Sequence, residues 1–152
     1  MKRDSIQPEL YKACVEAFYK ALKECPTVRE AFDMAYKLPA PRFYILHSTA
    51  KNTVPKYMKG GWRPAHAANA EMYEELATRV RERWAKGEKG YACIAEILME
   101  PAPSFYLSRG RFLGIVYDEL RRRRKKMKED RKRIERDEDD RLRAVSAPEG
   151  AE

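Results

Sequence analysis

The chain has 152 residues, of which 43% are hydrophobic and 37% are charged, and its formal net charge is +8 at pH 7. This length can hold one compact domain with a real core, whereas two separately folding halves would each be marginal. No run of about 18 apolar residues occurs and the first five residues are polar, so neither a membrane span nor secretion is indicated. We expect a soluble, cytoplasmic protein.

The first predicted element is an amphipathic helix over residues 8–24. Pro8 suits a first helical turn, and Ser5 or Gln7 can cap it. Its apolar residues recur at helical spacing and are Leu10, Cys14, Ala17, Phe18, Ala21, Leu22 and Cys25. Pro26 ends this helix, and Thr27 with Glu30 forms a capping box for a second short helix.

A six-residue motif then occurs twice, as residues 39–44 (PAPRFY) and 101–106 (PAPSFY), 62 positions apart. Each Pro-Ala-Pro stops the preceding helix, and the aromatic pair after it suits a packing corner. Flanking apolar residues fall into register at the same shift, which indicates an internal duplication. The sequence therefore predicts an all-α fold of two related three-helix units, about 8–59 and 69–120, joined by Pro-aromatic corners within one body, 1–120.

The segment after the first motif, residues 47–57, predicts a third helix that contains Pro55. Because proline in a helix interior breaks a hydrogen bond, this helix either starts late, capped by Asn52 or Thr53, or is kinked. In the second copy Asn69 is the expected cap of the first helix, and a short apolar helix follows Tyr91.

The last predicted helix begins at Ser108, a good N-cap, and it is long and basic. We expect Gly110 and Gly114 to let another backbone approach it. Residues 121–133 hold ten basic and two acidic residues, and residues 134–152 hold three basic and seven acidic ones. We expect residues 121–143 to be a charged helical extension, supported by pairs such as Lys125 with Glu129, and residues 144–152 to be a disordered tail.

This charge pattern favours nucleic-acid binding, since a basic helix face can follow a phosphate backbone and a helix N-terminus beside arginines attracts phosphate. The partner is DNA or RNA, DNA being the stronger expectation. The candidate nucleic-acid-binding residues are Arg109, Arg111, Arg121, Arg122, Arg123, Arg124, Lys125, Lys126, Lys128, Arg131, Lys132 and Arg133.

Other interpretations of the charged helix stay open. A basic run can be a solvated helix end that the helix dipole favours. The acidic residues could fold back over the basic ones, or the two blocks could pair between subunits of a homo-oligomer. A protein of another class, a structural or virion-type assembly protein, could use the same charged helix to contact protein partners.

Two resemblances bear on these interpretations. Residues 91–120, with Ser108 before the second helix, look like a helix-turn-helix unit, although residues 101–107 make a longer turn than that motif has. The PAPRFY-type motif followed by an amphipathic helix is similar to one in small uncharacterised proteins of gut bacteria and their phages. That resemblance implies an origin and supplies no role. Phosphate binding by a basic helix would suit a regulatory or packaging role for a phage or mobile element, in the bacterial cytoplasm or the phage particle.

No enzyme is indicated by the sequence. His47 and His66 lie in loop regions without the spacing of a metal pair, and no nucleophile or phosphate-loop motif occurs. The three cysteines, Cys14, Cys25 and Cys93, form no ligand pattern and suit buried thiols in a reducing compartment. We expect no catalytic residue, no metal, no cofactor and no small-molecule substrate.

Overall fold

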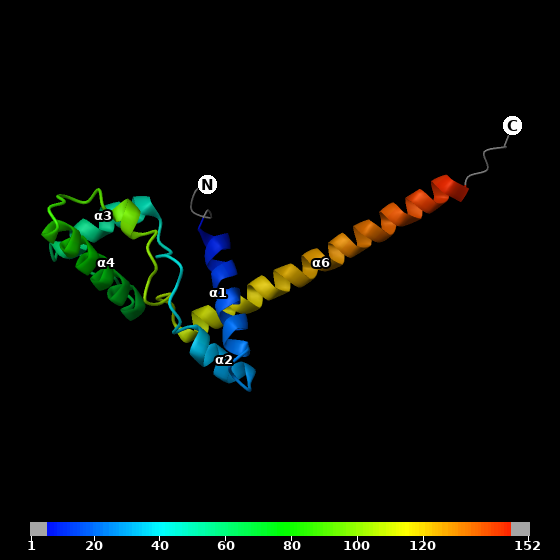
Figure 1. The fold of residues 1–152 in the computed structure, drawn as a ribbon, viewed down its shortest axis with the longest axis horizontal. Coiled ribbons are helices and arrows are strands. Elements are labelled where there is room, and N and C mark those ends of the chain that lie inside the picture. Colours follow the sequence, from blue (N-terminus) through cyan, green and yellow to red (C-terminus); the bar gives the residue numbers. More distant parts are fainter. Residues whose placement is uncertain (1–5, 147–152) are drawn as a thin grey trace. The chain divides into compact units, whose positions relative to one another are not determined.

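A computed structural model describes residues 6–146, and every regular element in that range is a helix (Figure 1). The helices are α1 (Gln7–Leu22), α2 (Val28–Ala35), α3 (His47–Met58), α4 (Ala67–Ala85), α5 (Ile94–Ile97) and α6 (Arg109–Ser146). No strand occurs within residues 6–146, where strand-type pairing is limited to one isolated antiparallel bridge between Ala40 and Ala102. The predicted all-helical class and long C-terminal helix are confirmed.

The chain divides into two compact units. The first is Met1–Val116, which holds α1 to α5 and the start of α6, and the second is Tyr117–Glu152, which holds the rest of α6. Helix α6 continues through residues 144–146, the first part of the predicted tail. The rest of that tail, 147–152, and the predicted cap Ser5 lie outside the described residues.

Helices α1 and α2 form a corner in which Pro8 and Thr27 act as expected, whereas the predicted cap Gln7 is wrong: Ile6 is the N-cap of α1, without a side-chain hydrogen bond, and Gln7 is the first helical residue. Pro8 lies in the first turn of α1, and the amide of Glu30 donates a hydrogen bond of 3.2 Å to Oγ1 of Thr27, the N-cap of α2. The two helices meet through Phe18 and Phe32, whose stacked rings have centroids 4.3 Å apart. The apolar stripe of α1 therefore packs on α2.

The two copies of the motif lie against each other. The amide of Ala40 donates to the carbonyl of Ala102 and the amide of Ala102 donates to the carbonyl of Ala40, both at 2.9 Å. Beyond this bridge the ring of Phe43 stacks on Tyr106, and that of Tyr44 stacks on Phe105, with centroids 6.0 and 6.3 Å apart. The contact is reciprocal, because exchanging each residue for the one 62 positions away turns one stacked pair into the other.

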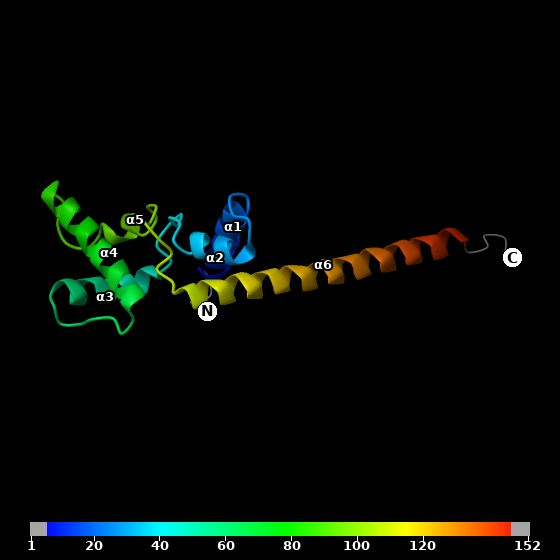
Figure 2. The same cartoon turned by 90° about the horizontal axis from the view of Figure 1, so that it is seen from below.

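The helix that follows each motif packs on helices from the other half of the first unit. Helix α3 lies on α4, where the hydroxyls of Thr53 and Tyr73 are hydrogen bonded at 2.8 Å (Figures 1 and 2). The start of α6 lies on α2, where the ring of Phe112 meets Phe32 edge to face with centroids 6.4 Å apart. Segments far apart in the sequence thus share each half of the core.

Arginines on α4 tie it to the neighbouring segments. The Arg83 guanidinium contacts Glu96 at 2.9 Å and Glu100 at 3.0 Å, and Arg79 contacts Glu100 at 3.2 Å. Arg79 also lies over the ring of Phe43, 4.9 Å from its centroid, in a cation–π contact. One helix of the second copy is therefore anchored to the corner of the first.

One of the two alternatives for α3, the late start, and the predicted cap of α4 are wrong. Helix α3 begins at His47 and runs through Pro55, which is followed by only three helical residues, so the late start is excluded. Pro55 is tolerated because it lies in the last turn, where one lost hydrogen bond affects little of the helix. Helix α4 begins at Ala67 after the extended N-cap His66, which places Asn69 inside the first turn and not at the cap.

The prediction for the two glycines of α6 is also wrong, since a Cβ added at Gly110 or Gly114 would meet no atom within 4 Å. No backbone approaches either position, so each glycine costs helix stability without a packing gain. We expect Gly114→Ala to raise the free energy of unfolding by about 1 kcal/mol, as measured by urea denaturation. A decrease would contradict the open surroundings of this residue.

The buried thiol of Cys14 makes stability depend on alkaline pH. Burial raises the pKa of Cys14 from 9.0 to about 12, and the Arg111 charge opposes this only in part. The unfolded chain therefore loses this proton first, and stability is lost progressively between pH 9 and about 12. In urea denaturation at pH 8 and 10.5, we expect Cys14→Ala to lose less stability than the native chain over that interval. Parallel losses in the two proteins would exclude the thiol as a cause.

Candidate nucleic-acid interface

Ten of the twelve predicted binding residues lie in the second unit, on α6 between residues 121 and 133, here called the basic segment. All of them are exposed except Arg123, which is partly buried. Successive residues point about 100° apart around the helix. The basic segment therefore presents positive charge on most of its circumference, and Arg121, Lys125, Lys128 and Lys132 share an arc of about 60°. We call these four residues the phosphate face.

Acidic residues of α6 engage part of the basic segment. Glu119 is 3% exposed and pairs with Arg122 and with Arg123, the latter at 3.5 Å. Arg121 pairs with Asp118 at 3.7 Å, and Arg133 with Asp130 at 3.4 Å. The exposed pairs contribute little to stability.

The ion pairs predicted within this segment differ from those formed. We expected Lys125 with Glu129, Arg131 with Glu135 and Arg133 with Asp137, each four residues apart. Among residues 6–146 none of the three forms, and Arg133 instead pairs three residues back, with Asp130. A basic residue placed N-terminal to its acidic partner is the weaker orientation of such pairs, which is consistent with this outcome.

The remaining basic side chains of the segment have no acidic partner within the described part of the chain. They are Arg124, Lys125, Lys126, Lys128, Arg131 and Lys132. Their charges are exposed and uncompensated, which is the arrangement that attracts phosphate and other anions.

Residues 135–140 hold five acidic residues and Arg136, and we call them the acidic segment. Both segments belong to one continuous helix, α6. A straight helix cannot bring one of its own turns onto another, so the acidic segment does not cover the basic segment of the same chain. The interpretation in which the acidic residues fold back is therefore wrong for residues 134–146, and its remaining residues, 147–152, lie outside the described part of the chain.

Arg109 and Arg111 lie in the first unit, at the start of α6. The Ser108 hydroxyl accepts a hydrogen bond of 3.1 Å from the amide of Arg111, which confirms the predicted N-cap. The guanidinium of Arg109 pairs with Asp33 of α2, so this residue has a structural contact. Arg111 is exposed and borders a hollow of about 620 Å³.

The segment that resembles a helix-turn-helix unit, residues 91–120, differs from that motif in the lengths of its first helix and of its connection. Helix α5 has four residues, and residues 98–108 separate it from α6. The second helix of this segment is thus far from the first in sequence, and a first helix of one turn offers little surface to brace it.

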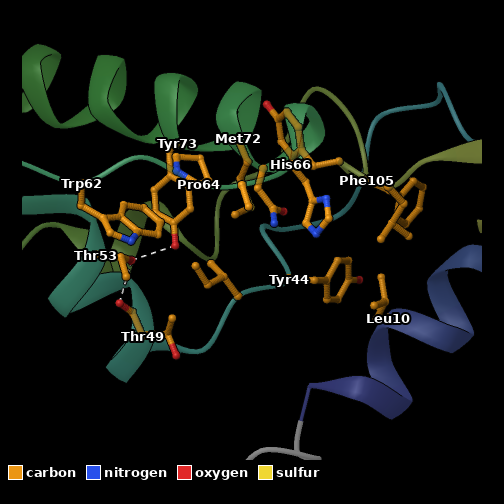
Figure 3. A pocket seen from close by; sticks show the side chains of 15 residues that line it. Leu10, Tyr44, Thr49, Thr53, Trp62, Pro64, His66, Met72, Tyr73 and Phe105 are labelled. Carbon is orange, nitrogen blue, oxygen red and sulfur yellow. Dashed lines mark hydrogen bonds between the residues drawn. The ribbon is translucent and has the colours of Figure 1, made fainter. Parts of the chain in front are cut away.

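A second hollow of the first unit was not predicted from the sequence (Figure 3). It has a volume of about 460 Å³ and adjoins the hollow beside Arg111, with which it shares His66, Asn69, Tyr106 and Leu107. Trp62 packs edge to face on Tyr73 at one end of it, with centroids 5.0 Å apart. The aromatic residues in the loop between the two copies could have pointed to this hollow. However, nothing in the sequence places them beside the two Pro-aromatic corners.

Two polar side chains that line this hollow, Thr53 and Tyr73, are engaged with each other. The Thr53 hydroxyl donates to the carbonyl of Thr49 at 2.8 Å and is hydrogen bonded to Tyr73 (Figure 3). Burial raises the pKa of Tyr106 to about 12, and negative charge from Glu75 adds to the shift, so this hydroxyl is neutral at physiological pH. Aromatic side chains, Tyr44, Trp62, Tyr73, Phe105 and Tyr106, form much of the wall of this hollow.

Residues 6–146 contain neither a metal-ligand cluster nor a helix suited to span a membrane. No group of three or more His, Cys, Asp or Glu side chains is arranged to hold a metal ion there. Likewise, none of the helices in that range combines the length and the apolar character that crossing a membrane requires.

Comparison of the chain with protein-family models, with curated proteins and with solved structures finds no match.

Proposed function

We propose that this protein binds nucleic acid, with DNA as the expected partner, mainly through phosphate contacts from the basic segment of α6. The observation that carries the proposal is the exposed run of six basic side chains without an acidic partner within residues 6–146. Phosphate contacts of this kind release counterions from the duplex and supply affinity that is independent of sequence. The protein contributes charge and position, not base readout.

The phosphate face is the part of the basic segment best suited to follow a strand. Its residues lie along about 17 Å of helix axis at 1.5 Å per residue. Lys125, Lys128 and Lys132 belong to the partner-free set, and Arg121 has only a loose pair of 3.7 Å with Asp118. Long, flexible side chains on one arc can reach successive phosphates at the same time.

Arg109 has a smaller part in this proposal than its position suggests. Its pairing with Asp33 ties the start of α6 to α2, so removing it affects the fold of the first unit. Arg111 is exposed and, among the described residues, has no ion pair, so it keeps the role of a phosphate contact at the start of the helix.

The body that carries this helix is proposed to be an internal duplication. Three observations support it. The reciprocal bridge of Ala40 and Ala102 joins equivalent positions, the two aromatic stacks exchange under the 62-residue shift, and α3 and α6 begin at His47 and Arg109, which are also 62 apart. A pseudo-two-fold axis through the bridge relates the copies, with their third helices exchanged.

A role in an assembly, such as a phage particle or a packaging complex, is the second candidate. One observation favours it: α6 carries exposed apolar side chains, Met127, Ile134, Leu142 and Val145, that phosphate binding does not use. The PAPRFY resemblance to proteins of gut bacteria and their phages fits either a regulatory or a packaging role.

The test is a fluorescence-anisotropy titration of the full chain against labelled duplex DNA, duplex RNA and single strands of arbitrary sequence at 50 and 200 mM salt. With six or more phosphate contacts, we expect affinity to fall by about a thousandfold or more between these salt concentrations. Similar affinity for unrelated sequences is expected because the contacts are to phosphate. Absence of binding at 50 mM salt would reject the proposal and favour the assembly role.

A further inference from the structure

The second unit leaves a stripe of apolar side chains uncovered on α6. Met127, Ile134, Leu142 and Val145 are 62%, 53%, 65% and 78% exposed. At 100° per residue they fall within an arc of about 80°, so they form one narrow face along some 27 Å of helix. We call this the apolar stripe. Apolar residues repeated on one side of a polar helix are typical of a helix that pairs with another helix.

The charges along α6 indicate which partner can cover the apolar stripe. The basic segment carries +8, and the acidic segment carries −4. Since α6 is one helix, these two segments cannot meet within a chain, but they meet when a second copy of α6 lies alongside in the opposite direction. A parallel arrangement would instead place the two basic segments side by side, with strong repulsion.

We propose that α6 forms an antiparallel pair with α6 of a second copy of this chain, over residues 124–145. This inference is independent of nucleic-acid binding, because it uses a different face of the helix. The phosphate face is centred about 110° from the apolar stripe. Lys128, its residue nearest the stripe, flanks the pair, and Arg121, Lys125 and Lys132 stay exposed.

The side chains define the register of this pair. When the two copies of Ile134 lie next to the two-fold axis, Met127 of one chain meets Leu142 of the other. The same register places Arg131 opposite Glu138 of the second copy, twice in the pair by symmetry. The apolar contacts and the oppositely charged contacts therefore favour the same alignment of the two helices. A shift by one helical turn would break both kinds of contact.

Flanking residues agree with this alignment. In the same register Lys128 lies near Asp139 of the second copy, and Asp130 lies near Arg141. Like charges meet at Glu135, beside the axis, and where Asp130 lies near Asp137 of the second copy, which weakens the pair. An overlap of 22 residues with one apolar residue every three to eight positions is a short interface, so we expect dissociation constants of about 1–100 µM.

Sedimentation equilibrium of the full chain from 1 to 300 µM tests the association. We expect a reversible monomer–dimer equilibrium, with Ile134→Asp weakening it at least tenfold. The matched control is Arg136→Asp, which introduces the same side chain on the far side of α6 and should change the constant less than threefold. A native chain that is monomeric at 300 µM, or two variants that behave alike, would overturn the proposal.

Cysteine pairing tests the direction and the register. In chains in which Cys25, the partly exposed native thiol, is replaced by serine, a mixture of Met127→Cys and Leu142→Cys proteins treated with diamide should give a disulfide-linked heterodimer. Each protein alone should give little dimer. The reverse pattern, with Met127→Cys linking to itself, would mean a parallel pair and would overturn the inference. Circular dichroism checks that every variant keeps its helix content, and neither experiment contains nucleic acid.

Discussion

Replacing the four residues of the phosphate face, Arg121, Lys125, Lys128 and Lys132, by alanine is expected to lower affinity for duplex DNA by about a thousandfold at 0.1 M salt. Four lost phosphate contacts also reduce the slope of log affinity against log salt by about 3.6, at 0.9 per contact. The fold should be unaffected, since all four side chains are exposed and alanine favours helix. Anisotropy titrations at several salt concentrations measure both quantities.

A matched pair of double variants separates the phosphate face from net charge. Lys125→Ala with Lys132→Ala removes two charges seven residues apart on this face. Lys126→Ala with Arg133→Ala removes two charges with the same spacing about 100° further round the helix. We expect the first variant to reduce the salt slope by about 1.8 and the second by less than half of that. Equal reductions would show that binding depends on charge density and not on one face of α6.

The helices were predictable wherever a local signal marks an end. Thr27 and Ser108 were expected as caps, and both accept the hydrogen bonds that define an N-cap. Asn69 failed as a cap because the two alanines before it favour helix, so that α4 begins three residues earlier than a cap at Asn69 would allow. Local side-chain chemistry decides a helix start only where the preceding residues do not themselves favour the helix.

The helices on which α3 and the start of α6 pack could not be read from the sequence. Ala50 and Val54 of α3, like Phe112 and Val116 of α6, are buried with the spacing of one helix face. Such a face fits the helices of its own copy or those of the other copy, and periodicity does not distinguish them. The eleven-residue connections before α3 and α6 are long enough to reach either. Tertiary packing makes that choice.

For the charged helix α6, too, part of the arrangement was predictable from the sequence and part was not. Composition predicted where the charges are, and helix geometry predicted which of them share a face. Which arginines are engaged depended on Glu119, an acidic residue that is 3% exposed and holds Arg122 and Arg123. A buried carboxylate on a helix surface has no sequence signature, so the division into engaged and free cations needed coordinates.

Replacing Phe112 by alanine is expected to give the largest loss of stability of any single change discussed for this chain. Its side chain is fully buried, and its ring contacts Phe32 of α2 and Phe105 of the second corner, with centroids 6.4 and 5.7 Å apart. Truncation removes both aromatic contacts and leaves a cavity, at a cost of about 3–5 kcal/mol in urea denaturation. Met99→Ala, at a side chain that is 61% exposed, is the control and should cost less than about 0.5 kcal/mol.

The location of the damage tests the exchanged packing. Because α6 covers α2, the cavity left by Phe112→Ala should speed amide hydrogen exchange in α1 and α2 while α4 and α5 keep their protection. Val54→Ala on α3 should do the opposite, raising exchange in α4, since α3 packs there through Thr53 and Tyr73. If α3 and α6 instead protected the helices of their own copies, the hydrogen-exchange patterns of the two variants would be reversed. In that case the proposed duplication would remain, but each third helix would pack within its own copy. The reciprocal bridge of Ala40 and Ala102 would then be the main contact between two self-contained halves.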